Sequence, residues 1–321
     1  MDKVAIQRHV AATERFLVKV RRDMLDPEAS KGNDNTLYVT MESGIHVLSR
    51  VYAGSDRPVE CFEPEIRNIW YMFIISAQNI DADHLAQDRL LRIITSARHR
   101  GILHKAANPT RDLMPEDLGA GGPHTRQLRI GEGSEAAETT HGHIWVDLPF
   151  LVPDVRDAWK RLMEPSASPA HCCNLTSAIA RLAGSGVCGD AFSQCGLEIM
   201  KLALETPLPP SSAAGSNTAQ RLALVRIWLR YAGEVLLRLC LVASLPLDSS
   251  WALDEQQPIG PLAQQANIGP AAAWSRERFT FWKDRLATMT AEAEGDEPIE
   301  ALCAYSIRNI WETHFGILKD S

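Results

Sequence analysis

The chain has 321 residues, of which 45% are hydrophobic and 23% charged, and its formal net charge at pH 7 is −7. This hydrophobic content suffices for a globular core and excludes a wholly disordered chain. The negative net charge argues against a nucleic-acid-binding protein, since such proteins contact phosphates through an excess of Lys and Arg.

Charged residues interrupt the N-terminal segment, so a secretion signal is not expected there. The most apolar segment, 219–245, carries Arg221, Arg226, Arg230, Glu234 and Arg238, which excludes a membrane span. The seven cysteines are odd in number and do not have the spacing of a zinc finger or ribbon. We therefore expect a cytoplasmic protein with reduced thiols and no bound metal.

Helical periodicity of the hydrophobic residues dominates the sequence. It predicts helices in the N-terminal segment and over 36–53, 64–80, 85–100, 152–163, 169–183, 191–205, 218–245, 270–293 and 298–319. Gly101 and Gly184 are placed as C-terminal stops of two of them. The best strand candidate, 143–146, is short. The sequence predicts an all-α, bundle-like fold with about ten helices.

Three irregular stretches interrupt these helices. Residues 105–140 are rich in Gly and Pro and predict a flexible insertion or a lid. Residues 207–216 are read as a linker, and 249–269 as an irregular connection. Because none of these stretches separates two independent cores, we expect residues 1–321 to form one helical domain.

An internal repeat follows two acidic-Pro pairs. Ile66-Arg67-Asn68-Ile69-Trp70 recurs as Ile307-Arg308-Asn309-Ile310-Trp311. In a helix, Ile and Trp at this spacing share one face and Arg takes another. One interpretation is a pair of helices whose arginines, Arg67 and Arg308, meet at one site. The other is two amphipathic helices that use the same core pattern.

The segment His141-Gly-His143-Ile-Trp145-Val-Asp147 follows the long insertion directly. In an extended chain the two histidines share a face, and Asp147 can orient one imidazole or complete a metal site. Two histidines without a clear third ligand make a weak metal signal. The alternative is a loop that rejoins the core through its apolar residues.

Polar residues form a stripe on the long helix predicted over 218–245. Arg226, Arg230, Glu234 and Arg238 recur every four residues on an otherwise apolar helix. The stripe is either a narrow solvated face or the lining of an internal cavity, where arginines would suit an anionic or carbonyl-bearing ligand. Aromatic residues in candidate core segments either line an apolar pocket or simply fill the core: Trp70, Trp145, Trp228, Tyr231 and Trp311.

The segment WVDLPFLVPDVRDAW, residues 145–159, resembles a motif of a mostly helical filamentous-fungal family of unassigned function. Residues 88–94, DRLLRII, and the closing 307–311 helix are also similar to it. The resemblance covers most of the chain from about Thr36 onward. Because many genes of that family lie near secondary-metabolite clusters, it implies a role in secondary metabolism. It implies no catalytic residues.

Together these observations favour a fungal biosynthetic enzyme of the cyclase, isomerase or dehydratase type, which acts on a small molecule in an inter-helix pocket without a cofactor. The candidate catalytic residues are Arg67, Arg230, Glu234, Arg308, His143 and Asp147. Two alternatives stay open: a non-catalytic helical binding or scaffold protein, and a metal-dependent enzyme that uses His141 and His143. The oligomeric state is not predicted.

Overall fold

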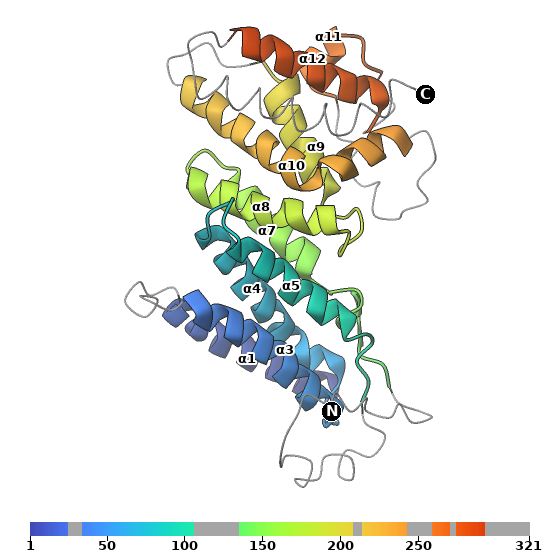
Figure 1. Ribbon diagram of the computed structural model, residues 1–321. Coiled ribbons are helices and arrows are strands. Elements are labelled where there is room, and N and C mark those ends of the chain that lie inside the picture. The colour runs from blue at the N-terminus through green and yellow to red at the C-terminus, as the bar shows by residue number, and fades with distance from the viewer. Residues whose placement is uncertain (25–33, 106–134, 208–213, 243–258, 270–273, 293–321) are drawn as a thin grey trace. The chain divides into compact units, whose positions relative to one another are not determined.

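The computed structural model describes residues 1–24, 34–105, 135–207, 214–242, 259–269 and 274–292 (Figure 1). Within these residues the regular secondary structure is helical apart from one isolated bridge and one hairpin of two-residue strands, β1 (Glu138–Thr139) and β2 (Gly142–His143). The prediction of an all-α fold is therefore confirmed.

The described residues group into two compact units. Unit 1 comprises residues 1–76 and 89–158, and unit 2 comprises residues 77–88 and those from 159 onward. The division passes through the helices α4 (Glu63–Asn79), α5 (Ala86–His99) and α7 (Leu151–Leu162).

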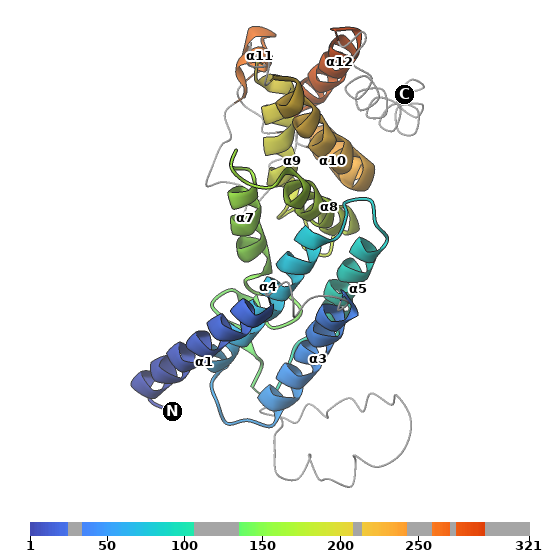
Figure 2. The ribbon, with the colours of Figure 1, turned by 90° about the vertical axis from the view of Figure 1, so that its left-hand side faces the viewer.

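Unit 1 is built from helices that meet through cation–aromatic contacts. Arg21 of α1 (Lys3–Met24) lies over the ring of Tyr71 in α4, at 4.6 Å, which fixes α1 against α4 (Figure 2). Arg89 of α5 likewise lies over Tyr38 of α3 (Asp34–Ala53), at 4.4 Å. The short 3₁₀ helix η1 (Val59–Phe62) leads from α3 into α4.

Unit 2 is organised around the long helix α10 (Ala214–Val242), which packs on α8 (Pro169–Ser185), α9 (Ser193–Met200) and α12 (Arg276–Glu292). A π-helical turn, η3 (Lys201–Glu205), extends α9, and the short α11 (Pro261–Gln265) packs on that turn. Helix α10 is kinked at Ala232, whose φ of −136° is not helical.

Buried tryptophans form the centre of each unit and satisfy their indole N–H groups. In unit 1, Trp70 donates to the carbonyl oxygen of Pro149 at 2.7 Å, and Trp145 donates to Ser49 Oγ at 2.9 Å. In unit 2, Trp159 donates to Thr176 Oγ1 at 3.0 Å. Such bonds let a large aromatic residue fill the core without an unpaired polar atom.

Most helix bounds agree with the sequence-based predictions to within a few residues, whereas three local predictions are wrong. The strand predicted over 143–146 is replaced by β2, because Trp145 adopts a left-handed φ of 71°. The helix predicted over 270–293 begins only at Arg276. Gly184 lies inside α8, and Gly186, with a φ of 68°, ends that helix.

Several predictions fall partly or wholly outside the described residues. These are most of the 105–140 insertion, most of the 207–216 linker, residues 249–258 and the 298–319 helix, which contains Arg308 and Trp311. The single-domain organisation stays a prediction.

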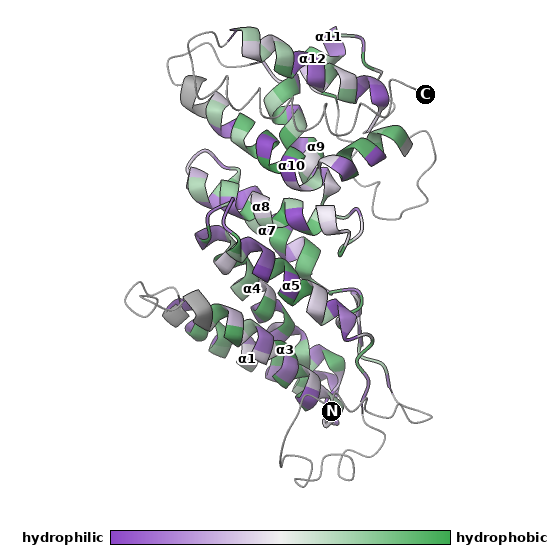
Figure 3. Ribbon diagram, viewed as in Figure 1, coloured by the Kyte–Doolittle hydropathy of each residue, from purple (hydrophilic) through white to green (hydrophobic). Residues whose placement is uncertain are grey.

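Figure 3 shows hydrophilic and hydrophobic residues alternating along the helices. No described helix combines the length and the apolar character that crossing a bilayer would require.

Candidate functional site

The candidate site lies in unit 1, where the turn after β2 meets the first turns of α4 and α7. Its five members interact with Arg67, His141 or both and are called the Phe150 cluster: Glu63, Arg67, His141, Phe150 and Asp154. Glu63 and Arg67 are one helical turn apart on α4, so both side chains leave the same face of that helix.

The turn that presents Phe150 is held in an unusual backbone conformation. Trp145, Leu148 and Phe150 have φ values of 71°, 49° and 68°, in the left-handed region that L-residues rarely adopt. Such conformations persist only where the surroundings enforce them, and they cluster at functional sites. Here the anchors are the Trp70–Pro149 hydrogen bond and the edge-to-face contact between Trp70 and Trp145, whose ring centroids are 6.3 Å apart.

Arg67 and His141 both contact the ring of Phe150. The Arg67 guanidinium lies 4.4 Å from the ring centroid, and the imidazole centroid of His141 lies 4.7 Å from it. Arg67 also donates to Asp154 Oδ1 at 2.9 Å. The Arg67 side chain is 45% exposed and that of Asp154 is 20% exposed, so the cluster is open to solvent on the arginine side.

Two carboxyl groups of the cluster hold their protons more tightly than usual. Burial raises the pKa of Glu63, and the neighbouring Glu60 raises it further, although Arg67 and His141 act in the opposite direction. Burial also raises the pKa of Asp154, against the lowering effect of Arg67. A raised pKa favours the protonated form of a carboxyl group, which is the form that acts as a general acid.

The turn also brings together two of the residues predicted from the sequence. His143 Nδ1 lies 3.2 Å from Asp147 Oδ2, and the same oxygen accepts the backbone N–H of His143 at 2.7 Å. His143 Nε2 lies 3.9 Å from Glu138. Asp147 thus contacts both the backbone and the imidazole of His143. Among the described residues, no group of three or more His, Cys, Asp and Glu side chains is placed to hold a metal ion.

The arginine stripe of α10 lies in unit 2 and contacts aspartates of other segments. Arg226 and Arg230 both donate to Asp83, at 3.0 and 2.9 Å, and Arg238 donates to Asp190. Glu234 is exposed. Trp228 is fully buried and packs against Gly196, where an added Cβ would lie 2.9 Å from the indole.

Two hollows bear on the predicted inter-helix pocket, and neither is lined by a predicted site residue. An open surface hollow of about 530 Å³ follows α3 and is lined by Arg50, Val51 and residues 54–57. An apolar crevice in unit 2, between Leu229 and Trp282 among others, has a volume of only about 10 Å³. That is no more than the space that one water molecule needs. A substrate-sized pocket therefore stays a prediction.

Sequence reasoning missed Glu63, Phe150 and Asp154. In the sequence, Glu63 stands out only as part of an acidic-Pro helix start. Its chemical interest comes from its burial and from the charge of His141, which is far from it in the sequence and which no local pattern encodes.

A family model described as a protein of unknown function, DUF3632, matches residues 70–286. The chain belongs to the DUF3632 family. The match includes residues 141–154 and the whole of α10, while Glu63 and Arg67 precede it. The resemblance inferred from residues 145–159 is thereby confirmed.

One curated relative of this DUF3632 protein is named for its genetic setting. It is the "Oxopyrrolidines biosynthesis cluster protein G" of Penicillium oxalicum, which is 25% identical over 271 residues, or 79% of this chain and 68% of that protein. No solved structure matches the chain.

Proposed function

We propose that this chain is an enzyme of a fungal secondary-metabolite pathway that transforms a small molecule by acid–base chemistry without a redox cofactor. The relative named for a biosynthesis cluster supports the pathway assignment. The observation that carries the enzymatic part is the raised pKa of Glu63 and Asp154 beside Arg67 in the Phe150 cluster. Paired acids and a cation are the groups that proton transfer requires.

Each group has a distinct task in this proposal. A protonated carboxyl, Glu63 or Asp154, donates its proton to a carbonyl or a leaving hydroxyl of the substrate. The guanidinium of Arg67 stabilises negative charge that develops on the substrate oxygen. His141 accepts the proton that the substrate releases. If the donated proton stays on the substrate, the reaction is an isomerisation or a cyclisation. If the protonated hydroxyl leaves, it is a dehydration.

His143 and Asp147 are proposed to position the turn rather than to react. Asp147 links the backbone and the imidazole of His143, which fixes the segment that leads to Phe150. Trp70 and Trp145 are both buried. They support the same turn through the bond from Trp70 to Pro149 and their edge-to-face contact. Arg230 and Glu234 belong to unit 2 and take no part in this reaction.

The test compares metabolites in the fungus that encodes the chain. The gene is deleted and complemented with wild type, Glu63→Gln, Asp154→Asn or the control Glu42→Gln, which changes an exposed carboxyl on α3 outside the cluster. We expect at least one of Glu63→Gln and Asp154→Asn to lower product at least about 100-fold and to accumulate an intermediate, since general acids contribute roughly 10²–10⁴-fold. The control should match wild type.

The accumulated intermediate then distinguishes the reaction types. Purified protein should convert it without added nicotinamide or flavin, to a product of equal mass or of one water less. Normal product levels in both Glu63→Gln and Asp154→Asn would refute the catalytic assignment. If gene deletion lowers the product but the purified protein converts no accumulated intermediate, the result instead favours the non-catalytic binding protein.

A further inference from the structure

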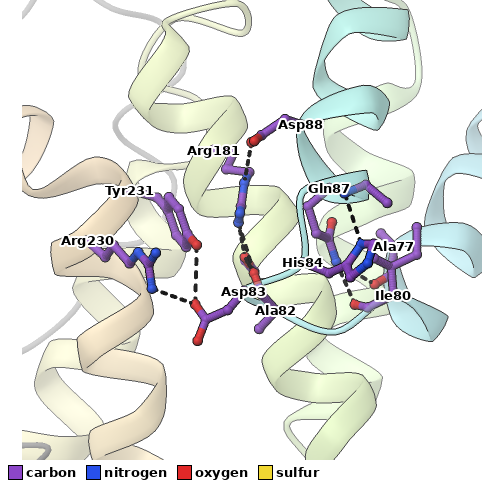
Figure 4. A network of polar contacts seen from close by, with 12 residues as sticks. Ala77, Ile80, Ala82, Asp83, His84, Gln87, Asp88, Arg181, Arg230 and Tyr231 are labelled. Carbon is purple, nitrogen blue, oxygen red and sulfur yellow. Dashed lines mark hydrogen bonds and ion pairs between the residues drawn. The ribbon is translucent and has the colours of Figure 1, made fainter.

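Asp83 connects the segment between α4 and α5 to the kinked helix α10 in unit 2. Its Oδ1 accepts from Arg230 at 2.9 Å and from the Tyr231 hydroxyl at 3.2 Å (Figure 4). Its Oδ2 accepts from Arg226 at 3.0 Å. Two guanidinium groups and a phenol around one carboxylate make an arrangement suited to carboxylate recognition. We call Arg226, Arg230 and Tyr231 the α10 cradle.

The cradle is held in place by contacts that do not involve Asp83. The guanidinium of Arg181 lies 3.6 Å from the centroid of the Tyr231 ring, and Arg181 is itself buried. Arg181 is fixed in turn by Asp88, at 2.8 Å, and by the carbonyl oxygen of Ala82, at 3.0 Å (Figure 4). Removing Asp83 would therefore leave the tyrosine ring oriented for another acceptor.

The backbone that carries Asp83 is fixed as well, so only its side chain needs to move. Ser177 Oγ donates to the Ala82 carbonyl oxygen at 2.6 Å. Gln87 donates to the carbonyl oxygens of Ala77 and Ile80, at 3.1 and 2.8 Å. The Asp83 side chain is 44% exposed, so it can rotate into solvent while the segment keeps these bonds.

The cradle carries two positive charges, and Asp83 brings one negative charge to them. The side chains of Arg226 and Arg230 are 25% and 40% exposed, so a solute can reach them. Burial tends to raise the pKa of Asp83, but the hydrogen bond and charge of Arg226 and the charge of Arg230 together lower it. The cradle thus favours an ionised carboxylate.

We propose that the α10 cradle is a binding site for a carboxylate-bearing ligand, and that Asp83 occupies this site as an internal substitute when the ligand is not bound. A ligand with two carboxylates has an advantage over Asp83, because it offers one carboxylate to each guanidinium group. The α10 cradle belongs to unit 2 and the Phe150 cluster to unit 1, and the proposal does not depend on the proposed reaction.

The test is a calorimetric titration of the purified full chain with malonate at constant ionic strength, with neutral malonamide as the control solute. Asp83→Ala should bind malonate at least tenfold more tightly than wild type, because the internal competitor is gone. In the Asp83→Ala background, Arg230→Gln should abolish that gain. Asp190→Ala is the matched control. It removes the aspartate that pairs with Arg238, which lies on α10 but outside the cradle, and it should leave malonate binding as in wild type.

Two results would overturn the proposal. One is a folded Asp83→Ala protein that binds malonate no more tightly than wild type. The other is a lack of specificity: malonate binding by Asp83→Ala persists undiminished after Arg230→Gln, or malonamide binds equally well. If Asp83→Ala does not fold, Asp83→Asn takes its place, since the amide keeps the shape but no longer competes as an anion. The same tenfold criterion then decides.

Discussion

Glu205 and Arg278 form a bidentate ion pair in which neither side chain is exposed to solvent. The distances are 2.6 Å from Arg278 Nε to Glu205 Oε1 and 3.0 Å from Nη2 to Oε2. The same carboxylate accepts from Trp282 Nε1 and from the backbone N–H of Gly260, both at 2.7 Å. One buried carboxylate thus joins η3, α12 and the segment before α11.

Replacing one partner of this ion pair should lower the free energy of unfolding far more than expected from the effect of replacing both partners together. Glu205→Gln leaves a buried guanidinium without its counter-charge and should lower the free energy of unfolding by about 3–5 kcal/mol. Glu205→Met combined with Arg278→Met should cost clearly less than the sum of the two single changes. Urea unfolding of wild type, Glu205→Met, Arg278→Met and the double variant measures this coupling, and strictly additive losses would contradict it.

Sequence periodicity located the helices well because it reports which face of a segment is buried. It could not locate the polar contacts between segments. Asp83 and Arg226 are 143 residues apart, and Glu205 and Arg278 are 73 apart. The stripe on α10 was predicted to be a solvated face or a cavity lining, and its spacing did not indicate that Arg230 and Arg238 each contact an aspartate of another segment. Tertiary packing supplied partners that no local spacing encodes.

The sequence alone also does not show at which positions the backbone conformation or a close contact requires glycine. At Gly142 the φ is +105°, and an added Cβ would lie 2.7 Å from Cβ of Asp147. Gly142→Ala should therefore strain the turn and lower the free energy of unfolding by at least about 1 kcal/mol. Gly44→Ala in α3 is the control, because its Cβ would meet only Ile69 at an ordinary 3.5 Å. Thermal unfolding compares them, and equal melting temperatures would contradict the prediction.

Gly184 marks a point at which α8 and α10 approach each other closely. A Cβ built there would overlap the backbone carbonyl oxygen of Tyr231, which cannot rotate away. Gly184→Ala should push the two helices apart at a cost of about 1–3 kcal/mol or more. Gly233→Ala on α10 meets no atom within 4 Å and should be tolerated. The prediction fails if chemical denaturation gives both variants the stability of wild type.

The contribution of Asp83 to stability should depend on pH in a defined direction. Its pKa in the folded protein is lowered from 3.8, since the Arg226 hydrogen bond and the two arginine charges outweigh the effect of burial. The folded state therefore binds this proton more weakly than the unfolded chain, and the stabilisation is full above about pH 5 and is lost as the pH falls below 3.8. Because Asp83 is half-exposed, Asp83→Asn should cost only up to about 1 kcal/mol at pH 7. That difference should narrow between pH 7 and about pH 3 in urea unfolding. A difference of the same size at both pH values would show that the carboxylate charge is not its source.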